Sequence, residues 1–166
     1  MLPPGLAFVA YNDRALKRFE SIQTPSFYLN LNRYITALND HSTPFTPNIS
    51  LFQGILAYAS LIKEEGFTEV IKRHYLVRDC LRQALIALDL ELLVVEEDAS
   101  PTVTAFKPKD AEELSTIKSE LDSRFNIVIA GGQGQLKGEI LRLGHLGQVT
   151  PFDILQAVAA LSLIHI

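Results

Sequence analysis

The segment Ile129–Gly147, IAGGQGQLKGEILRLGHLG, predicts a strand, a glycine-rich loop and a second strand. Side chains alternate between the two faces of a strand, so Leu141 and Leu143 are expected on one face of the sheet. Arg142 is then expected on the other face, beside Ile140. A guanidinium in that position needs an anionic partner, because a buried and unpaired charge is costly.

The composition of the chain excludes several classes of protein. Its 166 residues are 48% hydrophobic and 20% charged, which is typical of a globular protein with one domain or slightly more. The net charge of −4, with no basic stripe, gives no electrostatic basis for binding nucleic acid. No apolar run reaches the roughly 18 residues of a membrane span. The single cysteine, Cys80, is expected to pack on a helix and indicates a reducing, cytoplasmic location.

The second half of the chain predicts a small two-layer α+β unit. Strands are expected at Leu90–Val95 and Ser100–Phe106, followed by a helix, Ala111–Phe125, with Asp110 as its N-cap. The two strands of the opening segment come next, and a last helix begins at Pro151. This order, β-β-α-β-β-α, favours a mostly antiparallel sheet with its helices on one side.

The first half is mainly helical. Apolar periodicity predicts helices over residues 14–20, 30–39, 48–64 and 69–88. Asp13 and Thr68 are the expected N-caps of the first and the last of these helices. A short buried strand is predicted at Leu6–Tyr11. The two long helices at 48–64 and 69–88 resemble an interaction layer, such as one between subunits.

Three features could bind an anion, and each has a simpler structural interpretation. Gly131–Gly134 could cradle a phosphate, but it lacks GxGxxG spacing and a P-loop lysine, so a tight turn is the alternative. His145 could face the same pocket as Arg142, or it could be a packing residue. The hydroxyls of Thr43 and Thr46 precede a helix and could bind an anion or cap that helix. The histidines and the cysteine show no spacing typical of a metal site.

Several blocks of the sequence, taken in order, resemble class V aminotransferases of the alanine–glyoxylate and serine–pyruvate branch. The similarity covers nearly the whole chain, to about residue 160, and some members of the branch carry the label of a soluble hydrogenase small subunit. The blocks are PPGLAFV (3–9), TPFTP (43–47), ISL (49–51), SPTVT (100–104), IAGGQG (129–134), LKG (136–138) and LRLGH (141–145).

The resemblance implies the α/β fold of the type I pyridoxal-phosphate-dependent transferases, assembled as a homodimer. Residues 1–45 would be the tail of the large cofactor-binding domain. Residues 46–89 would be interdomain and dimerisation helices, and residues 90–160 the small C-terminal domain. The final segment, LSLIHI (161–166), also matches the translation of a transposon-end sequencing adapter. It is expected to fit the last helix poorly and to lie outside the natural fold, with an ordinary apolar C-terminus as the alternative.

The resemblance also implies roles for individual residues. Arg142 matches the arginine that binds the substrate α-carboxylate, and a bidentate pair supplies both energy and orientation. Thr46, or else Thr43, matches the hydroxyl that reaches the phosphate of pyridoxal 5'-phosphate in the neighbouring subunit. The Schiff-base lysine of the family lies before the Pro-Pro-Gly block and is absent, because Lys17 and Lys137 do not occupy the matching position.

The expected function follows from this partial set of residues. The intact protein is expected to transfer an amino group between a small amino acid and a 2-oxo acid such as glyoxylate or pyruvate. The chain alone is expected to be inactive, because it lacks the catalytic lysine. The alternative is a non-catalytic dimerisation or partner-binding module that acts through helices 48–88. A redox subunit is disfavoured, because one cysteine cannot ligate an iron–sulfur cluster.

Overall fold

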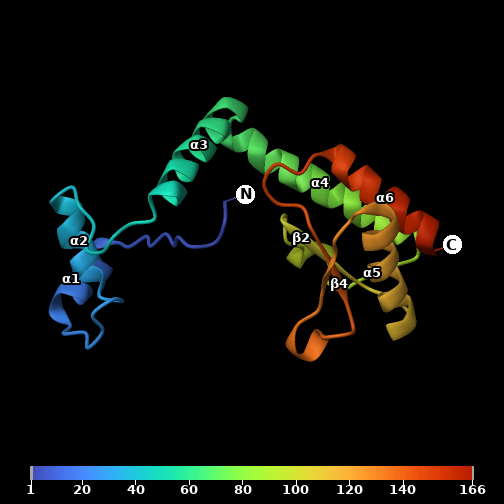
Figure 1. Ribbon diagram of the computed structural model, residues 1–166, viewed down its shortest axis with the longest axis horizontal. Helices are drawn as coiled ribbons and strands as arrows, with labels where there is room; N and C mark the ends of the chain where they lie inside the picture. The colour runs from blue at the N-terminus through green and yellow to red at the C-terminus, as the bar shows by residue number, and fades with distance from the viewer. Residues whose placement is uncertain (1, 166) are drawn as a thin grey trace. The chain divides into compact units, whose positions relative to one another are not determined.

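The computed structural model describes residues 2–165 and contains helices along most of that length (Figure 1). Residues 2–61 and 62–165 form two separate units. The elements, in chain order, are α1 (Asp13–Ser21), α2 (Leu31–Asn39), α3 (Ile49–Glu65), α4 (Phe67–Ala87), β1 (Glu91–Leu92), the 3-10 turn η1 (Glu96–Asp98), β2 (Val103–Lys107), α5 (Ala111–Phe125), β3 (Ala130–Gly131), the 3-10 turn η2 (Gly134–Leu136), β4 (Leu141–Gly144) and α6 (Pro151–His165).

The unit of residues 62–165 confirms the predicted β-β-α-β-β-α order after α4. Its four strands form one antiparallel sheet in the order β1-β2-β4-β3. Phe106 on β2 lies opposite Leu141 on β4, and Ala105 lies opposite Arg142. Because side chains alternate along each strand, the Phe106–Leu141 pair and the Ala105–Arg142 pair occupy opposite faces of the sheet.

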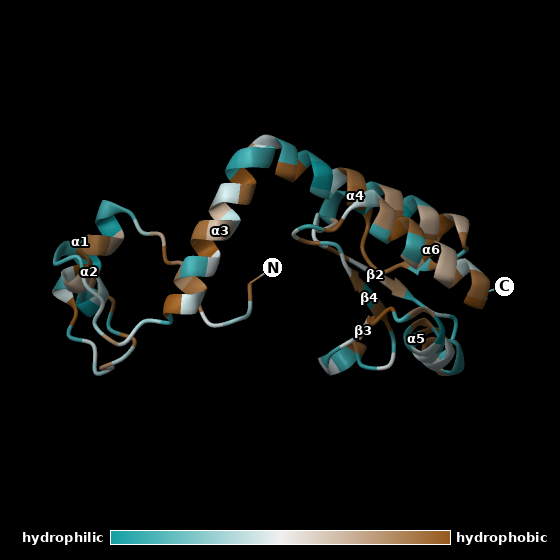
Figure 2. Cartoon of the chain, turned by 45° about the horizontal axis from the view of Figure 1, so that its top comes forward, coloured by the Kyte–Doolittle hydropathy of each residue, from teal (hydrophilic) through white to brown (hydrophobic). Residues whose placement is uncertain are grey.

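One face of the sheet is covered by helices α4, α5 and α6 (Figure 1). Apolar residues of these helices and of the sheet are enclosed in this layer (Figure 2). The cluster consists of Val77, Leu81, Leu85, Leu90, Phe106, Ile117, Leu121, Ile129, Leu141, Leu143, Ile154, Ala160 and Leu161. Phe106 and Leu141 are fully buried at its centre. Complete burial of such a side chain contributes about 1.5–3 kcal/mol, so this layer is the main source of the unit's stability.

Helix α5 begins at its predicted N-cap, Asp110, and helix α6 is capped by Thr150. The Asp110 carboxylate accepts a hydrogen bond from the Glu113 N–H at 2.8 Å. At α6, Asp153 accepts from the Thr150 N–H at 2.7 Å, and the Thr150 hydroxyl accepts from the Asp153 N–H at 3.4 Å. These reciprocal bonds satisfy donors that lack a partner in the first turn of a helix.

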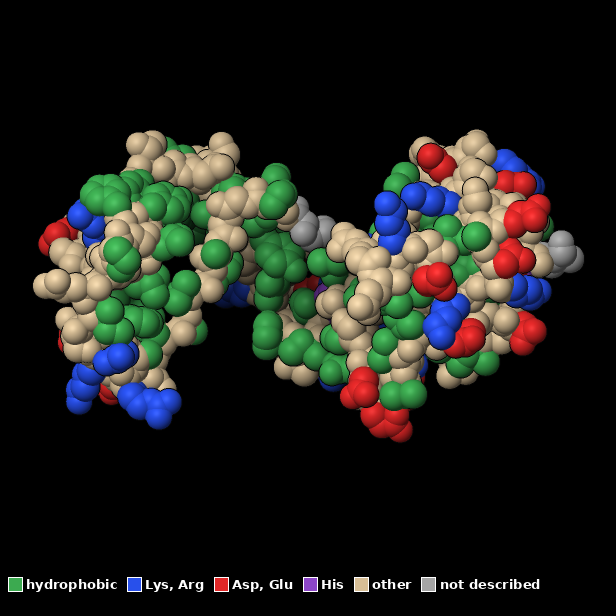
Figure 3. All heavy atoms as spheres, turned by 90° about the horizontal axis from the view of Figure 1, so that it is seen from below, with side chains coloured by type: hydrophobic (Ala, Val, Ile, Leu, Met, Phe, Trp, Pro, Cys, Tyr) green, Lys and Arg blue, Asp and Glu red, His purple; other side chains and the backbone are tan. Residues whose placement is uncertain are grey.

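The unit of residues 2–61 has very little core of its own. Leu51 is the one buried residue within it, and apolar side chains gather on its surface (Figure 3). The Phe45 ring lies in a small aromatic group with Phe27, Tyr28 and Tyr34, at centroid distances of 4.9–5.8 Å. This group ties together the segments before α2, α2 itself and the loop before α3.

Three details of the first half differ from the sequence-based expectation. Leu6–Tyr11 is not a strand and is exposed, since no neighbouring strand pairs with it. Helix α1 is capped by Asn12, whose side chain accepts from the Ala15 N–H, rather than by Asp13. Helix α4 begins one residue before Thr68, and Gly66 precedes it with a left-handed backbone and no side-chain cap. The helices predicted over 30–39 and 48–64 are confirmed.

Two strands of the second half are shorter than predicted. The segment 90–95 forms a strand only at β1, because the chain then turns into η1. The apolar run that enters the glycine loop pairs only at β3, since Asn126 adopts a left-handed backbone that ends α5. Ile140 is buried just before β4, whereas the strict alternation placed it on the open face with Arg142.

Helix α6 continues through residue 165, so the prediction that LSLIHI fits it poorly was wrong over the described part of that segment. Leu161 is fully buried in the core. His165 lies 2.8 Å from Glu113 on α5. The adapter origin of the segment stays a prediction, and Ile166 lies outside the described residues. No helix within residues 2–165 is both long and apolar enough to cross a membrane.

Candidate functional site

Arg142 lies on the face of the sheet that the helices leave open. Its direct neighbours on the adjacent strands are Ala105 on β2 and Ala130 on β3. Both side chains are single methyl groups, and the next residue on this face of β4 is Gly144. The predicted alternation is confirmed, because Leu141 and Leu143 are buried while Arg142 is half-buried. Its neighbours on this face of the three strands are therefore small.

One edge of the guanidinium is held by the protein. The Nε–H of Arg142 donates a hydrogen bond to the Gly131 carbonyl at 2.9 Å. Within residues 2–165, no carboxylate lies within ion-pair distance of Arg142, and its terminal nitrogens make no hydrogen bond. A charged group on a half-buried face with two open donors suits a planar anion such as a carboxylate.

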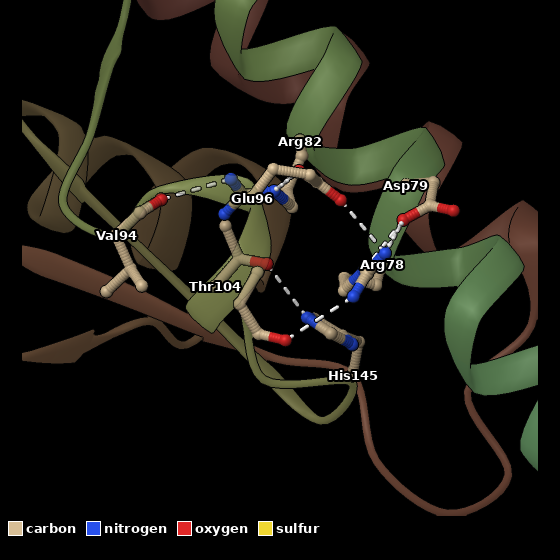
Figure 4. A network of polar contacts seen from close by, with 8 residues as sticks. Arg78, Asp79, Arg82, Val94, Glu96, Thr104 and His145 are labelled. Carbon is tan, nitrogen blue, oxygen red and sulfur yellow. Dashed lines mark hydrogen bonds and ion pairs between the residues drawn. The ribbon is translucent and has the colours of Figure 1, made fainter.

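His145 does not share this open face. It is 1% exposed, and its Nε2 lies 2.9 Å from the Thr104 hydroxyl, on the helix-covered side (Figure 4). Its backbone N–H donates to the Thr102 carbonyl at 2.9 Å. The interpretation of His145 as a packing residue is therefore confirmed, and the shared pocket with Arg142 was wrong. His145 fastens the end of β4 to the start of β2.

The arginines of α4 form a network with the segment after β1 (Figure 4). Arg82 is buried and donates to Glu96 at 2.7 Å and to the Val94 carbonyl at 3.0 Å. Arg78 donates to the other oxygen of Glu96 at 2.9 Å. The pairing of Glu96 with two arginines was not predicted from the sequence. The four-residue spacing of Arg78 and Arg82, which puts both on one side of a helix, was the signal.

The segment after β4 is also held from α4. His74 donates from Nδ1 to the Val70 carbonyl at 2.7 Å, so Nε2 is free to accept from the Gly147 N–H at 2.9 Å. Arg73 donates to the Gly147 carbonyl at 2.7 Å and pairs with Glu65 at 2.6 Å. These contacts give His74 a structural role. They fix the end of the strand that carries Arg142.

The buried imidazole of His145 predicts a pH-dependent stability. Burial lowers its pKa below the ordinary value of about 6.5, and the positive charges of His74 and Arg78 act in the same direction. The unfolded chain therefore binds a proton at a higher pH than the folded chain does. The free energy of unfolding should be highest above pH 6.5 and should fall as the pH drops below it, by at most about 1.4 kcal/mol per pH unit.

Urea unfolding of the wild type and of His145→Gln at pH 7.5 and 5.5 measures this effect. The wild type should lose more stability between the two pH values than the variant does. Equal losses would show that His145 does not cause the dependence. The pKa values of Glu65 and Asp153 are lowered by their hydrogen bonds to Arg73 and Thr150. Protonation of these two carboxylates therefore lowers the free energy of unfolding only at more acidic pH.

Thr43 and Thr46 belong to the unit of residues 2–61, whereas Arg142 belongs to the other unit. Both threonines are exposed. The Thr43 hydroxyl donates to the Phe45 carbonyl at 2.8 Å. Helix α3 is capped by Asn48, which accepts from the Leu51 N–H at 3.2 Å, so neither threonine acts as its cap. Their role in binding a phosphate stays a prediction.

The glycine loop is built as a tight turn. Gly134 and Gly138 have φ angles of 56° and 82°, which favour glycine. The 3-10 turn η2 closes between them.

Cys80 is exposed on α4, so its prediction as a packing residue was wrong.

A pyridoxal-phosphate site needs a free lysine amine beside the substrate-binding group. Lys107 shares the open face of β2 with Ala105, but it is 2.8 Å from Glu91 and lies in an ion pair. Lys137 lies within the glycine loop, and Lys17 lies on α1 in the other unit. The absence of the family's Schiff-base lysine stays a prediction, and Lys107 is not free to replace that lysine.

Comparison with known proteins gives consistent relatives. No family model matches the chain. It is 41% identical over 161 residues to a soluble hydrogenase small subunit of Synechococcus sp., covering 97% of this chain and 42% of that protein. An uncharacterized aminotransferase of Methanocaldococcus jannaschii is 33% identical over 163 residues, again covering 97% of this chain and 42% of the relative.

The solved structure of an alanine–glyoxylate aminotransferase from Nostoc sp. superposes with a TM-score of 0.84 at 25% identity. The match covers 92% of this chain and 42% of that protein. The chain thus spans about two fifths of the length of the relatives it matches. The resemblance to aminotransferases is confirmed, and the mixed α and β unit with its small antiparallel sheet matches their C-terminal domain.

Proposed function

Because the chain is related to aminotransferases over nearly its whole length, we propose that it is the C-terminal part of a pyridoxal-phosphate-dependent aminotransferase. The whole protein would transfer an amino group between a small amino acid and a 2-oxo acid such as glyoxylate or pyruvate. The observation that carries the proposal is Arg142, a guanidinium with open donors on the uncovered face of the sheet. Both substrates of such a reaction carry a carboxylate.

Arg142 would bind that carboxylate through two parallel N–H···O bonds. Because Nε already donates to the Gly131 carbonyl, the terminal nitrogens remain for the substrate. A bidentate pair fixes the plane of the carboxylate and therefore the direction of the bond that the reaction breaks. Ala105 and Ala130 flank the guanidinium and leave space for the rest of a small substrate.

The scarcity of buried side chains in residues 2–61 supports their assignment to a larger structure. A segment of that size with one buried residue contributes little apolar burial to its own stability. Residues 1–45 would be the tail of the large domain, 46–89 the interdomain and dimerisation helices, and 90–160 the small domain. In a homodimer, Thr46, or else Thr43, would reach the cofactor phosphate of the neighbouring subunit.

The relative named as a hydrogenase subunit does not favour a redox role for this chain. The one cysteine of this chain, Cys80, is exposed on α4, and an iron–sulfur cluster needs several thiolates. A non-catalytic binding module remains the second candidate, favoured by the exposed apolar side chains of α3, which include Phe52 and Leu56. Activity of the complete protein separates the two candidates.

The chain alone should show no transaminase activity. Mixed with pyridoxal 5'-phosphate, it should give no stoichiometric absorbance band of a lysine aldimine, because Lys107, which shares the open face of the sheet with Arg142, is already paired with Glu91. The complete protein should give both the band and amino transfer from a small amino acid to glyoxylate or pyruvate. A stoichiometric band in the chain alone would contradict its inactivity, and a complete protein without amino transfer would contradict the proposed function.

A further inference from the structure

We propose that Gly132 is a positioning residue for Arg142. Its missing side chain lets the loop of residues 131–140 close so that the Gly131 carbonyl holds the guanidinium. This inference rests on the proposed function of Arg142 as the group that binds a carboxylate. Gly132 itself would touch no ligand, and it would act on Arg142 only through the backbone of the loop.

The backbone around Gly131 is fixed by pairing with β4. Ala130 lies opposite Arg142, and Gly131 lies opposite Leu141. One residue beyond the strand, the Gly132 N–H donates to the Ile140 carbonyl at 3.1 Å. Pairing on both sides of Gly131 sets the direction of its carbonyl, which accepts from Arg142 Nε at 2.9 Å. A shift of the backbone at residue 132 would therefore move the acceptor of that bond.

No side chain fits at Gly132. A Cβ there would lie 1.9 Å from the Leu136 carbonyl oxygen and 2.9 Å from Ile140 Cγ1. The Leu136 carbonyl cannot move freely, because it accepts from the Glu139 N–H at 3.1 Å, within the turn that returns the chain to β4. An alanine would thus separate the two arms of the loop.

Gly131, the next residue, is a matched contrast. A Cβ at Gly131 would meet no atom within 4 Å. Its φ angle lies outside the left-handed range, so alanine suits its backbone. The same chemical change at two consecutive positions therefore separates the closure of the loop from a general effect of adding a methyl group.

Holding the guanidinium by Nε has a consequence for ligand binding. An arginine side chain loses rotational freedom when it binds an anion, which weakens the complex. With Nε already bonded to Gly131, part of that loss occurs during folding instead. Arg142 then presents its terminal nitrogens in one orientation, as a planar carboxylate requires.

Proton exchange at arginine Nε, measured by NMR on the 15N-labelled chain, tests the proposal. In the wild type, the Arg142 Nε–H should exchange about tenfold more slowly than that of Arg14, an exposed arginine on α1. Gly132→Ala should raise the exchange rate at Arg142 to the level of Arg14 and weaken pyruvate binding about tenfold. Gly131→Ala should leave both quantities at their wild-type values.

Each other outcome contradicts the proposal. Equal exchange rates at Arg142 and Arg14 in the wild type would show that the Gly131 carbonyl does not hold the Arg142 Nε–H. If the Arg142 Nε–H exchanged at the wild-type rate in Gly132→Ala, Gly132 would not position Arg142. Unfolding of Gly132→Ala would contradict the proposal as well, since a positioning residue leaves the fold intact. If instead Arg142→Ala bound pyruvate like the wild type, the proposed function would fail while the exchange comparison would still stand.

Discussion

Replacing Arg142 with alanine in the complete protein should raise the KM for the amino acid about 100-fold while the cofactor still binds. Two charge-assisted hydrogen bonds at about 1.5 kcal/mol each amount to about 3 kcal/mol, which is about a hundredfold in affinity. Lys107, on the same face of the sheet, is paired with Glu91 and is not free to take over this role. Steady-state kinetics with the amino acid, together with the cofactor absorbance, measure the two effects separately.

Arg124→Ala is the matched control. Arg124 lies on α5, is largely exposed, and pairs with Glu120 one helical turn earlier. Loss of such a surface pair costs little, so the KM should stay close to that of the wild type. If Arg142→Ala and Arg124→Ala gave the same kinetics for the amino acid half-reaction, Arg142 would have no place in the substrate site.

The second large effect is expected at the centre of the core. Phe106→Ala should lower the free energy of unfolding by about 3–5 kcal/mol, because the ring is fully buried between the sheet and the helices and its removal leaves a cavity. A loss of that size is a large part of the stability of a domain of this length. Urea unfolding followed by circular dichroism measures it.

Phe152→Ala provides the comparison, since the same residue type is removed from an exposed site. Phe152 lies in the first turn of α6 with 78% of its surface exposed. Its loss should change the free energy of unfolding by no more than about 0.5 kcal/mol. Similar destabilisation by both substitutions would show that the helices do not bury the face of the sheet that carries Phe106.

Local signals in the sequence were sufficient where a segment carries its own cap or alternation. Asp110 caps α5 as predicted, because the cap and the helix it serves lie within four residues. The alternation around Arg142 was also read correctly, since strands bury every second side chain. The alternation alone separates Arg142 from the face of the sheet that carries Leu141 and Leu143.

Other features depend on partners that are distant in sequence. The run at residues 6–11 has strand-like composition, but it forms no strand because no neighbour pairs with it. His145 and Thr104 are 41 residues apart, so only the register of β2 and β4 shows that they meet. The close approach of Gly132 to the Leu136 carbonyl likewise depends on how the loop closes. The glycines themselves indicated only that a turn was present.

The sheet of residues 62–165 ends on each side in a strand of two residues. β1 and β3 form its edges, while the longer β2 and β4 lie inside. A long exposed edge offers a row of unpaired backbone groups to which another chain can add, and this is a common route to fibrils. So short an edge offers few such groups. Copies of this unit are therefore not expected to extend one another's sheets, even in concentrated solution.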